Sequence, residues 1–378
     1  MNELIYFDNA ATSFPKPHAV LAAAYDTARR RGGNPGRGGH ALARAADGEI
    51  YACRKAVKEF LGAPSVESVV FTNNATSALN TCILGLIKPG DRVLTTDYEH
   101  NSVRRPLYSV RGITTEKVRV AFEDDEITVA HFREALEKGA DWLVISHASN
   151  VWGKTLPLRD VCAVAHEYGA RVIVDAAQTA GCLPIDVVSD GIDYLCAPGH
   201  KCMYGPQGTG LIVVNGEVPK PLTFGGTGSN SFSPRQPDYT PDALESGTLN
   251  TPAISGLRAG LGFITSFGGK KLRAHETALV RRAYEGLGRI GNVTLYTAAP
   301  TENDAPVLSF NFARKTSFEA AELYDRYGVC LRAGYHCAPD AHEKLGTSAH
   351  GTVRLSVGAF NTAFEIDRFL EITQKISK

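Results

Sequence analysis

The chain of 378 residues lacks an excess of either charge, because 40 Lys and Arg side chains balance 40 Asp and Glu side chains. A neutral chain has no net field to attract nucleic acid or an acidic membrane surface. The sequence also lacks any apolar run near the roughly 18–20 residues that span a bilayer. Met1–Ile5 lacks the charged and apolar regions of a signal peptide. We therefore expect a cytoplasmic protein that binds neither nucleic acid nor membrane.

The cysteine pattern excludes two common uses of that residue. Eight cysteines in a chain of this length do not make a disulfide scaffold. No Cys-x-x-Cys occurs, and adjacent His336 and Cys337 are poorly spaced for a tetrahedral zinc site, so we expect no metal site. Cys337 lies in a loop punctuated by Gly334 and Pro339. Four other cysteines lie among apolar residues and are interpreted as buried free thiols: Cys53, Cys82, Cys162 and Cys196.

The chain has no internal repeat and no low-complexity tract, but its apolar segments follow a clear order. Short apolar strands alternate with amphipathic helices, which is typical of a mostly parallel sheet covered by helices on both faces. This part predicts a large α/β domain over residues 15–255. Strands are expected at 69–72, 93–95, 142–146, 172–175, 194–197 and 210–214, after a helix that carries Ala46, Ile50, Cys53, Val57 and Leu61 at helical spacing.

A change of pattern predicts a second, smaller α+β domain, formed by residues 1–14 and 256–378. Hydrophobic residues make up 43% of the chain, which is enough for two cores. Thr362 and Glu365 have the spacing of a capping box and predict the start of a last helix. After long helices from Leu257, the expected elements are strand 307–312, helix 319–327, strand 329–332 and strand 352–356.

Two polar residues end successive expected strands and suggest a cofactor. Asp175 ends one strand, and Lys201 follows the next after a break at Pro198 and Gly199. An amine can bind the aldehyde of pyridoxal phosphate (PLP) and later act as general base, and an anion keeps the pyridine nitrogen protonated. A carboxylate in contact favours that charged form by roughly 1–3 pKa units. Each residue alone is also an ordinary strand cap or loop lysine, but their order favours PLP.

The segment Thr72–Asn80 offers hydrogen-bond donors to a phosphate. It runs from an expected strand into a helix whose first turn, at Ala75 and Thr76, points free N–H groups at an anion. The Thr76 hydroxyl can add a hydrogen bond. The alternative is an ordinary helix N-cap. Gly225–Ser229 and Ser246–Thr248 are weaker anion-binding candidates, and each is also interpretable as a simple turn.

Three further residues fit the ring of such a cofactor. His100 follows an expected strand, so its imidazole can reach the C-terminal edge of the sheet and stack on a pyridine. Asn150 and Gln178 also follow strands and can hydrogen-bond a ring hydroxyl. A lone histidine or asparagine at a strand end is also often only a satisfied polar group.

Together these residues resemble the fold-type I PLP enzymes of aminotransferase class V, and within it the cysteine desulfurase and selenocysteine lyase group. The resemblance implies the PLP-dependent transferase fold, with a mostly parallel seven-stranded sheet in the large domain, and a homodimer. It runs nearly end to end through motifs in a specific order: Tyr6–Thr12, Arg37–His40, Glu99-His100, Asp175–Gln178, Gly199–Lys201, Ser246–Thr251, Arg332–Pro339 and Val353–Ser356.

The resemblance implies a role for each candidate residue. Lys201 resembles the lysine that binds the cofactor, Asp175 the partner of the pyridinium nitrogen, and His100 the stacking histidine. The other candidates resemble ring-hydroxyl ligands (Gln178 and Asn150), phosphate ligands (Ala75, Thr76 and His200), a phosphate ligand from the other subunit (Thr248), and a clamp for the substrate carboxylate (Arg354, with Arg332 and Asn150).

The resemblance also gives Cys337 a role. In that group a loop cysteine attacks the sulfur of PLP-bound cysteine, takes it as a persulfide and leaves alanine. Here Tyr335 replaces the first histidine of the loop Arg-x-Gly-His-His-Cys-Ala, and Pro198 replaces a serine that supplies a phosphate-binding hydroxyl. Because a free thiol is only a few per cent ionised at neutral pH, we expect His336 or Arg332 to assist as a nearby cation.

The sequence is therefore interpreted as a cysteine desulfurase-like enzyme that converts L-cysteine to L-alanine and has a protein sulfur acceptor as a possible partner. Selenocysteine lyase is the close alternative, since it uses the same residues. Other class V reactions, such as transamination, epimerisation or kynurenine-type cleavage, do not need a loop cysteine. A nucleotide-binding Rossmann module is disfavoured because no Gly-x-Gly-x-x-Gly follows the first strand. The complete set of Lys, Asp, His, Arg and Cys argues against a PLP-binding scaffold without turnover.

Overall fold

The structure is a computed structural model and describes residues 4–36, 38–122 and 124–378, so Arg37 and residues 1–3 lie outside the described residues. Its main sheet has the strand order β2-β8-β7-β6-β5-β3-β4. Strand β8 runs antiparallel to both neighbours, and the other pairs are parallel. The predicted mostly parallel, seven-stranded sheet is confirmed. Its strands are β2 Val69–Thr72, β3 Arg92–Thr96, β4 Thr114–Val118, β5 Trp142–Ser146, β6 Arg171–Asp175, β7 Tyr194–Pro198 and β8 Gly210–Val214.

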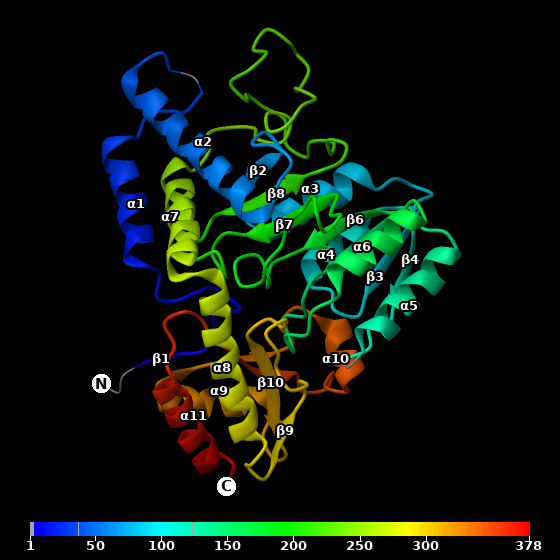
Figure 1. Cartoon of the computed structure of the whole chain (residues 1–378), viewed down its shortest axis with the longest axis vertical. Coiled ribbons are helices and arrows are strands. Elements are labelled where there is room, and N and C mark those ends of the chain that lie inside the picture. The colour runs from blue at the N-terminus through cyan, green and yellow to red at the C-terminus, as the bar shows by residue number, and fades with distance from the viewer. Residues whose placement is uncertain (1–3, 37, 123) are drawn as a thin grey trace.

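The apolar strands β5 to β8 form the centre of this sheet because both of their faces are covered. Successive residues of a strand point to opposite faces, and β5 shows it: Leu143 and Ile145 pack in one core, Trp142 and Val144 in the other. Helix α3 (Ala75–Leu86) and helix α4 (Asn101–Ser109) cover one face. Helices α5 (Asp125–Glu137) and α6 (Leu158–Glu167) cover the opposite face (Figure 1).

Strand β4 is the element of the sheet that the sequence patterns do not predict. Its residues Thr114 and Thr115 are exposed and Lys117 is also exposed, so it lacks the apolar run of the central strands. It lies at the end of the strand order, where one side has no neighbouring strand of the sheet. Charged residues are common on such edges because they discourage pairing with other chains.

Three helices stand beside the sheet. Helix α7 (Thr251–Phe267) packs against both α1 (His18–Arg30) and α2 (Ala41–Leu61) (Figure 1). Helix α2 begins where the His40 ring accepts a hydrogen bond from the Ala43 N–H and ends at Gly62, whose φ of 61° favours glycine. Its predicted apolar stripe is confirmed as buried: Ala46, Ile50, Cys53, Val57 and Leu61.

A second core contains residues from both ends of the chain. Ile5 and Phe7 pack there with residues from Leu279 to Ile376, below the main sheet in Figure 1. The division into domains at 1–14, 15–255 and 256–378 stays a prediction. This core packs on the sheet β12-β13-β10-β9 and the short pair β1-β11, formed by β1 Ile5–Tyr6, β9 Val293–Leu295, β10 Val307–Phe312, β11 Val329–Cys330, β12 Arg332–Gly334 and β13 Thr352–Ser356.

The predicted single strand 329–332 is wrong. The chain changes sheets at Leu331: β11 pairs with β1, and β12 pairs with β13. Periodicity cannot show such a change, because both halves are extended and the choice of partner strand depends on residues far along the chain. The capping box of Thr362 and Glu365 is confirmed. The helices of this part are α8 Gly269–Leu287, α9 Ser317–Arg326, α10 Pro339–Leu345 and α11 Ala363–Ile376.

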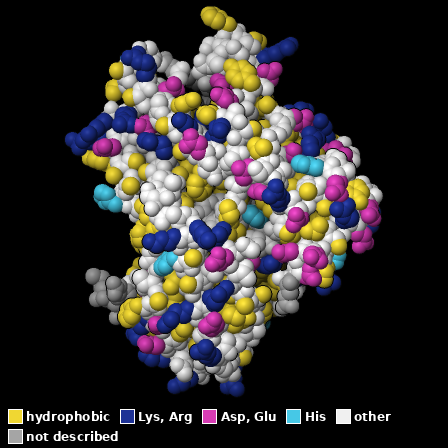
Figure 2. Space-filling model, viewed as in Figure 1, with side chains coloured by type: hydrophobic (Ala, Val, Ile, Leu, Met, Phe, Trp, Pro, Cys, Tyr) yellow, Lys and Arg dark blue, Asp and Glu magenta, His cyan; other side chains and the backbone are white. Residues whose placement is uncertain are grey.

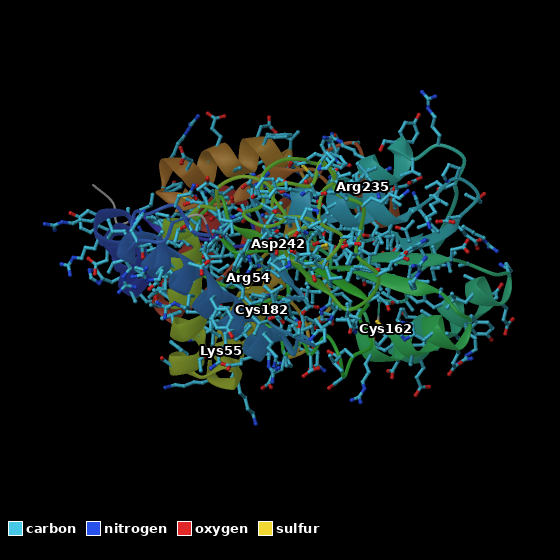
Figure 3. All side chains as sticks on the ribbon, turned by 90° about the horizontal axis from the view of Figure 1, so that it is seen from above. Arg54, Lys55, Cys162, Cys182, Arg235 and Asp242 are labelled. Carbon is cyan, nitrogen blue, oxygen red and sulfur yellow. The ribbon has the colours of Figure 1, made fainter. Side chains whose placement is uncertain are left out.

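The surface and the thiols agree with the composition. Figure 2 shows Lys, Arg, Asp and Glu side chains interspersed over one face, as a net charge of zero suggests. None of the described helices combines the length and hydropathy that crossing a bilayer requires. All eight cysteines are free, among them Cys162 and Cys182 in Figure 3. The four predicted buried thiols are confirmed.

We predict that the buried pair Arg54–Glu245 is a major stabilising contact, because it ties α2 to strand β2 and to the segment before α7 (Figure 3 labels Arg54). Glu245 accepts from Arg54 Nη1 at 2.8 Å and from the Phe71 N–H at 2.6 Å. Glu245→Ala leaves a buried guanidinium unpaired and should cost about 3–5 kcal/mol. Urea unfolding measures the loss. As a control, Arg282→Ala breaks the exposed ion pair with Asp367 and should leave the urea concentration at half-unfolding near that of the wild type. The same half-unfolding concentration for both variants would contradict the prediction.

Candidate active site

One cavity lies where the parallel strands of the main sheet end. The C-terminal ends of parallel strands share one edge, so side chains that follow them converge there. The cavity contains these predicted residues: Ala75, Thr76, His100, Asn150, Asp175, Gln178, His200 and Lys201. It also contains residues that the sequence analysis did not single out: Asn74, Tyr98, Ser102, Ser146, Ala148 and Ala177.

Four predicted residues do not line this cavity. Arg354 is buried, and its Nη1 donates to the backbone carbonyl oxygen of Asn150 at 3.0 Å. Arg332 and Cys337 are exposed on or next to strand β12. Thr248 is exposed in the segment before α7, away from the cavity of its own chain.

Lys201 and Asp175 face the cavity without touching. Among the described residues, no salt bridge within 4.0 Å joins these two side chains, although both line the same cavity. Burial is the main cause that raises the pKa of Asp175, and the Ala177 N–H (2.9 Å) and the Lys201 charge oppose it. Burial also lowers the pKa of Lys201 to about 8, against the Asp175 charge. The amine is thus partly neutral near physiological pH.

The backbone before Lys201 is held close to its neighbours. Pro198 ends strand β7 and pairs with Gly210 of β8. A Cβ at Gly199 would lie 2.3 Å from the Thr209 hydroxyl oxygen, so a larger residue would displace the turn. This close approach explains the glycine between the strand end and the lysine, and it fixes the direction in which Lys201 leaves the sheet.

His100 caps helix α4 and is neutral. Its Nδ1 accepts from the Ser102 N–H at 3.0 Å, which leaves the proton on Nε2. Burial is the main cause that lowers its pKa to about 4, with Lys201 as the strongest nearby charge. The ring is therefore flat, uncharged and held in one orientation.

Buried Glu99, next to His100, supports the strand ends. Its carboxyl oxygens accept from the Thr96 hydroxyl at 2.7 Å and from the Ser146 hydroxyl at 2.8 Å. Burial raises the pKa of Glu99 to about 8. These contacts join the ends of β3 and β5 beneath the cavity. The sequence pattern showed Glu99 only as part of a motif and gave no signal of this bridging role.

One end of the cavity has the donors that an anion needs. The Asn74 side chain caps α3 by accepting from the Ser77 N–H at 2.9 Å, and the N–H groups of Ala75 and Thr76 belong to the first turn, where they have no intrahelical partner. The Thr76 hydroxyl lies 2.8 Å from that of Ser102. Asn74 was recognisable as a cap residue before a helix, whereas nothing local to Ser102 indicates its place.

Three buried polar atoms in the cavity lining have no hydrogen-bond partner within the described chain: Tyr98 Oη, Asn150 Oδ1 and His200 Nδ1. Such atoms cost free energy unless a ligand or water satisfies them. Asn150 and Gln178 are themselves held in place, because Asn150 Nδ2 donates to the His336 carbonyl at 2.7 Å and Gln178 Nε2 donates to the Ala10 carbonyl at 3.3 Å. The cavity is therefore built for a polar ligand.

Arg354 and Arg332 lie directly opposite each other on β13 and β12. Facing residues of an antiparallel pair point to the same side, and like charges there repel unless an anion joins them. Arg354 Nη2 donates to Asp8 Oδ1 at 2.9 Å, and the buried Nε has no partner among the described residues. The pair can therefore accept a further carboxylate.

The loop of Cys337 is strained and exposed. His336 and Cys337 have positive φ values of 49° and 58°, which non-glycine residues rarely adopt. The Cys337 carbonyl accepts from the Asn101 N–H at 2.7 Å, so the loop touches the start of α4 directly after His100.

The expectation that His336 serves as a cation is wrong. Burial lowers its pKa well below 6.5 and the Arg354 charge adds to this effect, which outweighs the opposite influence of the Thr352 carbonyl oxygen 3.1 Å from Nε2, so the ring is neutral. The sequence placed His336 in a loop, and the pattern did not show that this part of the loop is buried. Arg332 is the remaining cation of the two that were expected. Within the described residues, no group of three or more His, Cys, Asp and Glu side chains could hold a metal ion.

Comparisons with known proteins agree with this arrangement. The family model described as aminotransferase class-V matches residues 5–369. The chain is 33% identical to a "Probable cysteine desulfurase" of Pyrococcus abyssi, over 100% of this chain and 95% of that protein. It is 31% identical to a cysteine desulfurase of Pectobacterium atrosepticum, over 99% and 93%.

A solved structure shares the fold. The apo structure of a cysteine desulfurase from Thermococcus onnurineus NA1 superposes with a TM-score of 0.89 at 31% identity, over 99% of this chain and 94% of that chain. The predicted fold class, a fold-type I α/β enzyme, and the predicted family are confirmed.

We predict that an amine-acylating reagent labels Lys201 at a rate that rises with pH and reaches half of its maximum near pH 8. Only the neutral amine reacts, and burial lowers the pKa of Lys201 to about 8. Labelling of cofactor-free protein at a series of pH values, followed by peptide mapping, measures this midpoint. Asp175→Asn should move the midpoint to lower pH, since the Asp175 charge favours the ammonium form. A midpoint near the ordinary 10.5 would contradict the effect of burial.

Proposed function

This chain belongs to the aminotransferase class-V family, and we propose on that premise that it is a PLP-dependent cysteine desulfurase. It removes sulfur from L-cysteine and leaves L-alanine and a persulfide on Cys337. One observation carries the proposal: an amine, a carboxylate and a neutral imidazole share one cavity, and the loop of Cys337 is hydrogen-bonded through its backbone carbonyl to the helix that begins after that imidazole. Cysteine is the substrate in the names of the relatives.

The donors of the cavity fit the cofactor. Lys201 would hold PLP covalently, Asp175 would face its ring nitrogen, and His100 would stack on its ring. Gln178 and the unpartnered Asn150 Oδ1 would meet the ring hydroxyl, which can donate to Oδ1. PLP supplies an electron sink for a bond broken at the substrate Cα. The phosphate would lie at the start of α3, with Ala75, Thr76 and the unpartnered His200 Nδ1.

Lys201 then has a second task as general base. A base is most useful when its pKa is near the working pH, and burial places the pKa of Lys201 at about 8. Once displaced from the cofactor, the neutral amine takes the proton from the substrate Cα. The Asp175 charge limits how far burial lowers that pKa, so one carboxylate serves both the ring nitrogen and the base.

Arg354 and Arg332 bind the substrate carboxylate in this proposal. Arg354 is positioned by Asp8 and by the Asn150 carbonyl, and its Nε remains available. A carboxylate between two facing guanidinium groups relieves their repulsion. Because Asn150 is also expected at the ring hydroxyl, this contact couples the position of the substrate to that of the cofactor.

Cys337 takes the sulfur. Its thiolate attacks the sulfur of the bound substrate, the Sγ–S bond forms, and the carbon–sulfur bond breaks. The electron pair of the broken bond stays on the carbon product, which takes up one proton at Cβ, regains one at Cα from Lys201 and leaves as alanine. The exposed loop position lets the resulting persulfide meet an acceptor, and Arg332 is the cation closest in sequence.

We further propose that the enzyme is a cytoplasmic homodimer that delivers sulfur to an acceptor protein. Thr248 would reach the phosphate of the partner's cofactor, which agrees with its exposure outside the cavity of its own chain. Gel filtration with light scattering tests the dimer.

The first functional prediction concerns Cys337→Ala. The variant should bind PLP and retain its visible absorbance but form neither persulfide nor sulfide from cysteine, because the nucleophile is missing. Alanine and enzyme-bound persulfide are assayed together, the latter by mass spectrometry. Cys330→Ala removes a thiol of the same segment and should behave as the wild type. Undiminished sulfur release by Cys337→Ala would contradict the assigned nucleophile.

The second functional prediction concerns Arg354→Lys. This substitution keeps the positive charge but removes the planar guanidinium group, which can bind a carboxylate through two hydrogen bonds. Its KM for cysteine should rise about tenfold to a hundredfold, since a charge-assisted contact contributes about 1.5–3 kcal/mol. Steady-state kinetics measure KM and kcat, and the absorbance of bound PLP reports the fold. Inhibition by cysteamine, which lacks a carboxylate, should be equal in both proteins. An unchanged KM for cysteine would remove Arg354 from the substrate site.

A further inference from the structure

A second hollow of 740 Å³ opens beside the Cys337 loop and is distinct from the cavity above. Its walls are α4 on one side, strands β3 and β4 on the other, and the start of α10 at one end. We call it the α4–β4 groove. It is lined by Asn101, Arg104, Arg105, Tyr108, Lys117 and Asp340, among others. None of the functions proposed above uses it.

The α4–β4 groove is directly connected to the loop of Cys337, the proposed nucleophile. Asn101 donates from its N–H to the Cys337 carbonyl at 2.7 Å, and Asn101 itself lines the groove. Pro339, at the other end of the same loop, also lines it, and two residues span at most about 7 Å. A molecule that fills the groove therefore lies close to the backbone of the loop that carries Cys337.

Buried Asp340 holds the walls together. Its carboxylate pairs with Arg104 on α4 and with Lys117 on β4, both at 2.6 Å. The neighbouring acid of β4, Glu116, pairs instead with Arg92 and Lys138 and is not part of the lining. The groove is thus a rigid surface with one carboxylate that is already shared by two cations.

The remaining charge is positive. Arg105 is exposed, lines the groove and forms no ion pair within 4.0 Å to any described residue. Its charge also reaches the active site: burial is the main cause that lowers the pKa of His100, and Arg105 is among the charges that add to it. Three cations against one carboxylate leave a surface that complements acid.

Two further observations favour a protein segment as the occupant. Tyr108 is 95% exposed at the rim, and Tyr and Arg are the residues that most often dominate protein interfaces. Strand β4 ends the order of the main sheet, so its outer edge has no strand partner among the described residues and an extended chain can pair with such an edge. Apolar Val110 and Ile113 also line the hollow and offer contact area beneath such a segment.

We propose that the α4–β4 groove docks an acidic segment of the sulfur-acceptor protein and presents its thiol to Cys337. This inference rests on the proposed desulfurase function. The acceptor thiolate attacks the outer sulfur of the Cys337 persulfide, a new S–S bond forms on the acceptor, and the Sγ–S bond of Cys337 breaks. Cys337 leaves as a thiolate and takes the proton that the acceptor thiol released. The step is an exchange without net oxidation or reduction.

The test compares two synthetic peptides, each with one cysteine, flanked either by Asp and Glu or by Lys. The PLP-loaded enzyme is charged with cysteine, and persulfide transfer to each peptide is timed by mass spectrometry. In a parallel reaction, dithiothreitol replaces the peptide as a small neutral thiol that does not need a docking site. The rate of transfer to each peptide is divided by the rate with dithiothreitol. The acidic peptide should react about tenfold faster or more at low salt, and the ratio should fall as salt is added.

Arg105→Glu should abolish or invert the preference for the acidic peptide, and Tyr108→Ala should weaken transfer to it. Both residues are exposed, so the fold should be retained. Arg289→Glu, on an exposed arginine of the region that contains the second core, is the matched control and should keep the preference. Equal rates for the two peptides, or a preference that survives Arg105→Glu, would overturn the docking site while alanine is still formed. Loss of alanine and persulfide with every thiol would overturn the proposed function and the docking site with it.

Discussion

The arrangement of the site depends on one constraint: a parallel sheet covered on both faces can offer polar groups only where its strands end. Strands β5 and β7 are buried throughout, β6 is buried after Arg171, and each gives way to polar residues at the same edge. The edge brings Asn150, Asp175 and Lys201 into one cavity although they are distant in sequence. The helices α3 and α4 begin there too, so a helix N-terminus and a capping histidine complete the lining.

Burial then sets the charge states. Desolvation raises the pKa of Asp175 and lowers those of Lys201, His100 and His336, so each group is moved toward its neutral form. The opposite charges of Asp175 and Lys201 limit this effect on both. A base with a pKa of about 8 beside a neutral, fixed imidazole follows from these two opposing influences. The same low polarity makes the unpartnered Asn150 Oδ1 and His200 Nδ1 costly until a ligand meets them.

The second sheet brings the remaining chemistry to that edge. Strands β12 and β13 place Arg332 opposite Arg354, and the chain then turns through the strained Cys337 loop to α10. Contacts on both sides fix this loop: Asn150 and Asn101 donate to the backbone of His336 and Cys337, and Asp340 joins α10 to α4 and β4. Cys337, the proposed nucleophile, is therefore exposed in a loop that is bonded to the start of α4 and that leads through Pro339 to the α4–β4 groove.

The sequence by itself determined the central strands, the capped helices and the polar residues that follow strand ends, because these patterns are local. It also indicated Lys201 with Asp175, since their order on successive strands is readable without coordinates. Tertiary structure decided the rest: the split of strand 329–332 between two sheets, the unpredicted edge strand β4, the bridging role of Glu99, and the neutral state of His336. These features depend on partners far along the chain and on how completely water is excluded, and neither property is contained in a local pattern of residues.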